Sequence, residues 1–152
     1  MADFEHEHDG TPVSQVVQDP LDAGREALRR RDWAEGYDLL KAADEADELG
    51  SEDLVLLGEA AMFTGRMEEL IAYLERAYRG YLHQGNTLRA AYVATMIAHD
   101  QKNNLQTAVA NGWMGRAKRL LDLEDEAPEH GYWALQRSPM QLGDGSFDEA
   151  FQ

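Results

Sequence analysis

The stretch LLGEAAMFTGRM, residues 56–67, decides the fold, because it has the composition of a helix and yet keeps a glycine in its interior. Glycine inside a helix costs roughly 1 kcal/mol relative to alanine. Either Gly58 is accidental, or a neighbouring helix packs so closely against it that no side chain fits there. A small residue that recurs at the matching place elsewhere in the chain would favour the second explanation.

Small residues do recur in register along the chain. One step leads from Gly24 to Gly58, and two slightly longer, equal steps lead from Gly58 to Ala98 and on to Ser138. The same steps connect a second series of small residues, Ala43, Ala77 and Ala117. Small residues that recur in register indicate repeated helix pairs whose members approach each other closely. The sequence therefore predicts that Gly58 is required for packing.

The composition favours helices throughout the body of the chain. The 152 residues are 43% hydrophobic, which is enough for one domain with a buried core. From Leu21 onward the chain is rich in Ala, Leu, Glu and Arg, which are helix formers, and no stretch alternates long enough to demand a strand. We expect an all-α fold of antiparallel helical hairpins. The predicted repeat units span about 20–47, 51–83, 87–122 and 131–152, the last one incomplete.

Local signals mark the ends of these helices. Turns are predicted near Arg31-Asp32, at residues 64–66 and near residues 101–104, Ser51 is expected to begin a helix, and Gly85-Asn86 should end the second unit. Pro139 should kink or divide the first helix of the fourth unit. Residues 1–19 hold five acids and no Lys or Arg, so this segment is predicted to be a disordered acidic tail that precedes a repeat domain at residues 20–152.

The register of small residues resembles the tetratricopeptide repeat, a helix pair with small residues at its eighth, twentieth and twenty-seventh places. Gly24 and Gly58 match the eighth place, and Ala43, Ala77 and Ala117 match the twenty-seventh. At the twentieth place Gly36 matches, whereas Leu70 departs from the pattern. The two longer steps, after Gly58 and after Ala98, also depart from it and imply longer helices or linkers. The resemblance implies a right-handed solenoid of about three and a half units.

A second resemblance concerns three segments, ALRRRDWAEGYDLL (27–40), AVANGWMGRAKRLLD (108–122) and PEHGYWAL (128–135). They look like the repeat regions of bacterial LuxR-type transcriptional regulators, in which such repeats precede a helix-turn-helix DNA-binding domain. This sequence contains no such domain, and GSFDEAFQ (145–152) supplies only part of a second helix for the fourth unit. We expect a fragment of a longer regulator or a short gene derived from one; the alternative is a capping half-repeat.

Charge and composition argue against several classes of protein. The net charge of −15 disfavours direct binding to nucleic acid. The chain has no cysteine, which excludes disulfides and thiolate metal sites and fits a reducing compartment. There is no secretory signal and no apolar run long enough to cross a bilayer. We therefore expect a cytoplasmic protein that does not bind membranes.

No group of residues has the pattern of a catalytic, metal or cofactor site. His6 and His8 lie beside acids, but a flexible tail cannot preorganise metal ligands, so they are expected to be solvated. His99 and Asp100 are neighbours on a helix and do not face each other, and His130 is expected in a turn or helix start. We expect no enzymatic activity, no cofactor and no metal. The three tryptophans, Trp33, Trp113 and Trp133, are interpreted as packing residues.

The resemblance to tetratricopeptide repeats implies that the first helices of successive units line a concave surface. Arg25 and Arg29 lie four residues apart on one helical face, and the register relates them to residues of the next two units. The predicted partner-binding groove consists of Arg25, Leu28, Arg29, Glu59, Met62, Phe63, His99 and Asn103. Guanidinium, aromatic and methionine surface suits a peptide or a partner helix. The alternative is that Arg25 pairs with Glu59 on a merely solvated face.

Together these features predict a protein-protein interaction or sensing module of a bacterial regulator, whose partner is a protein, a peptide or a helix. An alternative from another class is a standalone helical scaffold that forms a homodimer through its exposed C-terminal unit.

Overall fold

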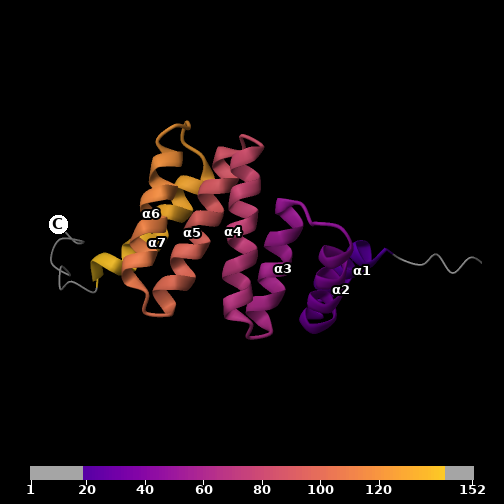
Figure 1. Cartoon of the computed structure of the whole chain (residues 1–152). Coiled ribbons are helices and arrows are strands. Elements are labelled where there is room, and N and C mark those ends of the chain that lie inside the picture. Colours follow the sequence, from indigo (N-terminus) through magenta and orange to yellow (C-terminus); the bar gives the residue numbers. More distant parts are fainter. Residues whose placement is uncertain (1–18, 143–152) are drawn as a thin grey trace, which may run out of the picture.

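The computed structural model describes residues 19–142, and these residues form seven α-helices with no strand (Figure 1). This confirms the all-α prediction. The segment 1–18, with the predicted acidic tail and His6 and His8, lies outside the described residues, as does 143–152. The helices are α1 (Pro20–Arg29), α2 (Trp33–Ala46), α3 (Ser51–Phe63), α4 (Met67–His83), α5 (Thr87–Asn103), α6 (Thr107–Leu121) and α7 (Pro128–Leu142).

Side-chain caps explain where several helices begin. Asp19 precedes α1, and its Oδ1 accepts the backbone N–H of Leu21 at 3.3 Å. Asp32 caps α2 and Asn86 caps α5 in the same way, each through a side-chain oxygen 3.2 Å from a backbone nitrogen three residues later. Such caps satisfy N–H groups that have no partner within the helix.

Left-handed residues separate the helices of the row. Positive φ angles occur at Arg31 (60°), Gly65 (78°), Gly85 (71°) and Leu105 (61°), each directly between two helices. The turns predicted near Arg31, Gly65 and Gly85 are confirmed. The turn predicted at 101–104 is wrong by a few residues, because α5 continues to Asn103 and Leu105 adopts the left-handed conformation. The step that relates Gly58 to Ala98 also relates Gly65 to Leu105, so the register marks this place although the residue is not glycine.

Two helix starts differ in detail from expectation. α3 begins at Ser51 as predicted, but Gly50 is its N-cap and Ser51 is buried against α4, where a Cβ added to Gly80 would lie 2.1 Å from its Oγ. α7 begins at Pro128, three residues before the predicted 131, because proline is well suited to a first helical turn. The helix continues past Pro139 to Leu142, so the proline does not divide it.

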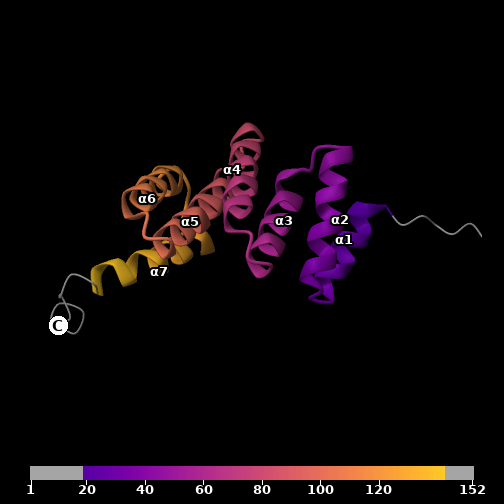
Figure 2. The same ribbon diagram turned by 60° about the horizontal axis from the view of Figure 1, so that its bottom comes forward.

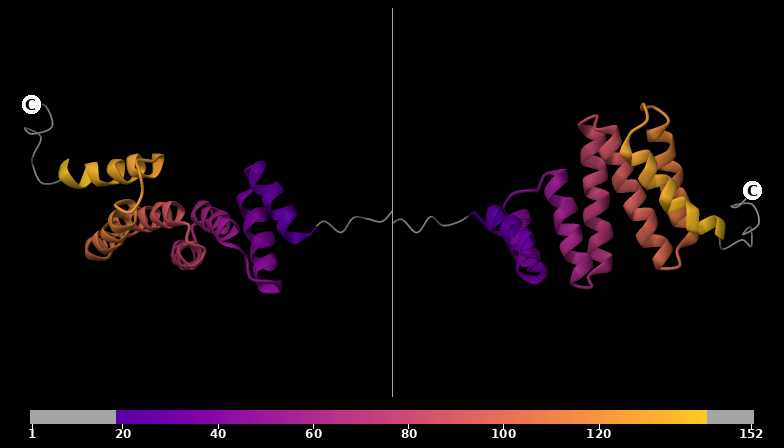
Figure 3. Two further views of the ribbon diagram at one scale, coloured as in Figure 1. Left: turned by 90° about the horizontal axis from the view of Figure 1, so that it is seen from above. Right: turned by 180° about the vertical axis from the view of Figure 1, so that it is seen from behind.

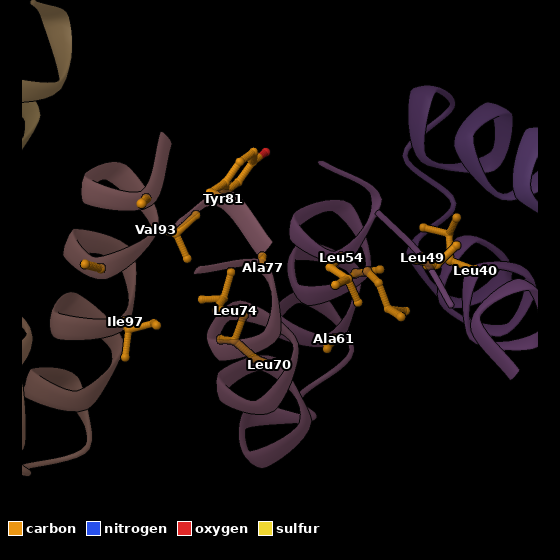
Figure 4. Packing of buried hydrophobic residues seen from close by; sticks show 14 of the residues in the cluster. Leu40, Leu49, Leu54, Ala61, Leu70, Leu74, Ala77, Tyr81, Val93 and Ile97 are labelled. Atoms are coloured by element: carbon orange, nitrogen blue, oxygen red, sulfur yellow. The ribbon is translucent and has the colours of Figure 1, made fainter. Parts of the chain in front are cut away.

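The helices follow one another in a row, with α1 and α7 at opposite ends (Figure 3). Each helix packs on its neighbours in sequence, α1 also contacts α3, and α7 lies along both α5 and α6 (Figure 2). The step from Gly58 to Ala98 is longer than the first because α4 and α5 have 17 residues each, whereas α2 has 14 and α3 has 13. The step from Ala98 to Ser138 also includes the longer link, residues 122–127, between α6 and α7. The core runs along the row, from Leu40 and Leu54 through Leu74 to Val93 and Ile97 (Figure 4).

The recurrent small residues stand where helices approach each other. A Cβ added to Gly24 would lie 2.9 Å from Cγ and Cδ2 of Leu40, and one added to Gly58 would lie 3.3 Å from Cδ1 of Leu70. Ala98 is buried at the corresponding place of the third unit. These contacts place Gly58 at a close approach of two helices, where an added Cβ would require Leu70 to shift by a few tenths of an ångström. The side chain of Ser138 is outside the described part of the chain.

Among the described helices, none combines the length and the apolar character that crossing a membrane requires.

Candidate functional site: a groove between α1 and α3

A groove of about 330 Å³ opens where α1 and the start of α2 face α3. Its apolar lining comes from Leu28, Trp33 and Leu56, and its charged lining from Arg25, Arg29 and Glu59. The three α1 residues occupy positions i, i+3 and i+4 of one helical face, and the two α3 residues are three apart. Helical periodicity in both elements therefore directs these side chains toward one space.

Trp33 at the start of α2 and Phe63 at the end of α3 join the first two helical hairpins beside this groove. Their rings are stacked, with centroids 4.1 Å apart and planes inclined by 18°. Trp33 is half-buried and lines the groove, whereas Phe63 is 54% exposed and extends the aromatic surface at the end of α3. Stacked aromatic pairs offer a large apolar surface at low cost in conformational entropy.

Arg25 is held in place by α3. Its Nε and Nη2 donate to the two carboxylate oxygens of Asp53, both at 2.8 Å, and its Nη1 lies 3.3 Å from Asp22. Hydrogen bonding to Asp53 raises the pKa of the Arg25 guanidinium. The partner of Arg25 is thus Asp53, and not Glu59 as in the alternative interpretation. This bidentate pair fixes one wall of the groove.

Arg29 is the exposed cation of the site. Its side chain is 72% exposed, and its Nη2 lies 2.9 Å from Glu26 on the same helix. An exposed pair at this spacing contributes about 0–1 kcal/mol. Arg29 can therefore exchange Glu26 for a carboxylate of a ligand at little cost.

The other predicted residues are divided between the border of the groove and a separate helix. Met62 and Phe63 lie at the exposed end of α3, next to the groove but not lining it. His99 and Asn103 are exposed on α5, where their Nε2 and Nδ2 atoms are 3.1 Å apart. Because α5 lies beyond α3 in the row, its residues do not share the space between α1 and α3.

Two lining residues were missed from the predicted groove. Leu56 precedes Glu59 by three residues, so helical spacing from Glu59 could have found it. Trp33 was interpreted as a packing residue, and it both packs on Phe63 and lines the groove. Of the other tryptophans, Trp113 is buried in the core, and half-buried Trp133 donates its indole N–H to the carbonyl of Met114 at 3.1 Å.

Two ionisable residues that the sequence singled out, Asp100 and His130, lie outside this groove. Asp100 is buried, which raises the pKa of its carboxyl, while neighbouring His99 is exposed, so the two do not act as a pair. His130 lies in the first turn of α7, where its Nδ1 accepts the N–H of Ala127 and its Nε2 lies 3.0 Å from the carbonyl of Leu121. Residues 19–142 contain no cluster of three or more potential metal ligands.

The groove thus offers apolar contact, an exposed guanidinium and a carboxylate, which are groups that a binding site uses. A scan against models of known protein families finds no match for this chain, and a search of curated proteins finds no relative.

Proposed function

We propose that this chain is a helical-repeat module that binds a peptide or a partner helix in the groove between α1 and α3. The observation that carries the proposal is the combination of an apolar lining (Leu28, Trp33 and Leu56) with an exposed, weakly paired cation, Arg29. Amphipathic ligands bind by placing apolar anchors in such a groove, and charged residues at its rim select the register.

The repeat architecture that we propose is a right-handed, tetratricopeptide-like solenoid of about three and a half units. Contacts between second helices of successive units support it. Arg76 of α4 bonds to Asp44 of α2, the hydroxyl of Tyr37 bonds to Glu69, and Tyr78 of α4 meets Trp113 of α6 edge to face. A stack of this kind buries each hairpin against the next and leaves an extended surface for ligands.

The chemistry of the groove defines the ligand further. A single aromatic or aliphatic anchor fits beside Trp33 and Leu56, and an acidic residue one helical turn away would pair with Arg29. We propose that such a ligand belongs to a protein partner, and that the chain serves as the interaction or sensing part of a bacterial regulator. The second half of this proposal rests on the resemblance of three segments to LuxR-type repeat regions.

Selection from a random peptide-display library would test the groove, with two matched charge reversals. Arg29→Glu changes a residue that lines the groove, whereas Arg30→Glu changes an exposed neighbour that pairs with Glu35 and does not line it. Selected peptides should lose most of their affinity for Arg29→Glu and retain it for Arg30→Glu. Equal affinity for the two variants would place the binding surface elsewhere.

A second candidate function is a scaffold that forms a homodimer through its C-terminal unit. Leu135 on α7 is 70% exposed and Leu123 before this helix is 77% exposed, and large apolar side chains at such exposure mark contact surfaces when they lie together. Light scattering of the full chain distinguishes the candidates. A dimer that Leu135→Glu converts to a monomer would favour the scaffold.

A further inference from the structure

A second groove lies at the other end of the row, between α6 and α7. It has a volume of about 280 Å³. The residues that line this groove are spaced i, i+3, i+4 and i+7 on α6 and i and i+4 on α7. The groove therefore follows one face of each helix. The lining residues are Asn111, Met114, Gly115 and Lys118 of α6 and Trp133 and Arg137 of α7. A helix is the element that fits a groove between two helical stripes.

On the equivalent face of each earlier even-numbered helix, side chains contact the next even-numbered helix. On α2, Tyr37 bonds to Glu69 of α4, and Arg66 at the start of α4 places its guanidinium carbon 4.0 Å from the centre of the Tyr37 ring. On α4, Tyr78 meets Trp113 of α6 with ring centroids 5.1 Å apart. The repeat step from Gly24 to Gly58 carries Tyr37 to position 71 on α4. The next step, from Gly58 to Ala98, carries position 71 to Asn111, so Asn111 is the α6 equivalent of Tyr37. The α6 groove therefore lies on the face through which α2 and α4 contact the next even-numbered helix.

We propose that residues 146–152 of this chain, SFDEAFQ, dock in this groove as a short helix antiparallel to α7. The inference rests on the repeat architecture proposed above. Phe147, Ala150 and Phe151 stand at i, i+3 and i+4, so one face of such a helix would be apolar. Glu69 is the α4 residue that bonds to Tyr37, and two successive repeat steps lead from it to position 109 and then to Glu149. Glu149 should therefore lie against Asn111, the α6 equivalent of Tyr37.

The length of the connection permits this placement. α7 ends at Leu142, and residues 143–145, Gly-Asp-Gly, separate it from the proposed helix. Glycine after a helix end readily adopts the left-handed conformation that reverses the chain. Seven helical residues rise about 10 Å, which is enough to run back along α7 past Arg137.

Charge favours residues 146–152 as the occupant of this groove over the same surface of a second molecule. Lys118 and Arg137 are exposed at the groove, so two copies placed face to face would oppose like charges. Residues 143–152 carry three acids, Asp144, Asp148 and Glu149, and no Lys or Arg. The segment therefore complements the groove in charge as well as in apolar character.

Disulfide trapping in the full chain tests this placement directly, because the native sequence has no cysteine. The test pair is Asn111→Cys with Glu149→Cys. The control pair is Gly112→Cys with Glu149→Cys, since Gly112 adjoins Asn111 but does not line the groove, and a Cβ there meets no atom within 4 Å. Under mild oxidation the test pair should close at least about tenfold faster than the control, as a helix docked in one register brings only one pair within bonding distance.

Charge reversal at the groove provides a second measurement in the same background. Arg137→Glu should slow closure of the test pair about two- to fivefold, whereas Arg116→Glu, which is exposed on α6 and does not line the groove, should leave it unchanged. Circular dichroism of each variant confirms that the helices remain.

Two outcomes would overturn the placement. Equal closure rates for the two pairs would show that residues 146–152 do not occupy the groove in this register, and disulfide-linked dimers would assign the groove to a second copy. Neither measurement involves α1 or α3. Arg29→Glu should therefore leave closure unchanged, and loss of peptide binding at the first groove can be told apart from failure here.

Discussion

Arg76 of α4 donates two hydrogen bonds to Asp44 of α2, at 2.8 and 2.9 Å, and so ties the α3–α4 hairpin to the α1–α2 hairpin. The two side chains are 28% and 15% exposed, so solvent screens the pair only in part. Asp44 also accepts the backbone N–H of Leu49 in the link between α2 and α3. One carboxylate thus stabilises both the contact between second helices and the connection that leads into the next unit.

Neutralising this carboxylate should destabilise the protein in a pH-dependent way. The Arg76 guanidinium lowers the pKa of Asp44 below its usual 3.8, so the stabilisation is present above that pH and is lost as the pH falls through the folded-state pKa. Asp44→Asn should lower the free energy of unfolding by about 1–3 kcal/mol at pH 7, the range for hydrogen bonds to charged groups. Urea unfolding at pH 7 and pH 3 measures it, and the loss should be smaller at pH 3.

Glu48 is the matched control for this prediction. It also faces Arg76, but at 3.5 Å and with a side chain that is 83% exposed. Glu48→Gln should change the free energy of unfolding by less than about 0.5 kcal/mol. Equal effects of the two substitutions would contradict the role assigned to the Asp44–Arg76 pair.

Asp100 should behave in the opposite way. Burial raises the pKa of its carboxyl, so the folded state binds the proton more tightly than the unfolded state. Stability from this group is greatest below pH 3.8 and falls as the pH rises through the raised folded-state pKa. Asp100→Asn should therefore increase the melting temperature at pH 7 and have little effect at pH 3. A decrease at pH 7 would mean that the charged carboxylate makes a stabilising contact.

The effects of three glycine-to-alanine substitutions on stability should follow the space that is available to a Cβ at each site. Gly24→Ala meets Leu40 at 2.9 Å and should destabilise by about 1–3 kcal/mol, the range for overpacking. Gly58→Ala meets Leu70 at 3.3 Å, so a gain in helix propensity of up to about 1 kcal/mol should offset most of the strain. Gly112→Ala meets nothing and should stabilise. Thermal unfolding of the three variants gives the ranking, and Gly24→Ala as stable as Gly112→Ala would refute the close approach.

The stack of Trp33 on Phe63 should appear as a coupling between repeat units. A double-mutant cycle with Trp33→Ala and Phe63→Ala should give a coupling of about 0.5–1.5 kcal/mol, as for other aromatic pairs. Phe63→Ala combined with Trp133→Ala, which is located at the far end of the row, should be additive. Additivity of the first pair would show that the stack does not couple the units.

The sequence alone was sufficient for the helices and most of their limits, because these depend on local interactions. Asp32 and Asn86 cap helices through their own side chains, and Gly65 and Gly85 tolerate the left-handed turn. Arg31 and Leu105 take the same conformation without being glycine, and the repeat steps place both in register with Gly65. Repeat spacing also located the close approaches at Gly24 and Gly58, since these lie within hairpins that are contiguous in sequence.

The tertiary structure decided which side chains meet across units. Helical spacing placed Arg25, Leu28 and Arg29 on one face, yet it could not show that Asp53 holds Arg25, or that Trp33 stacks on Phe63. Those pairs depend on the angle and offset at which one hairpin crosses the next, and these result from the combined packing of many side chains. For the same reason His99 and Asn103, equivalent by register, lie on α5 and outside the groove between α1 and α3.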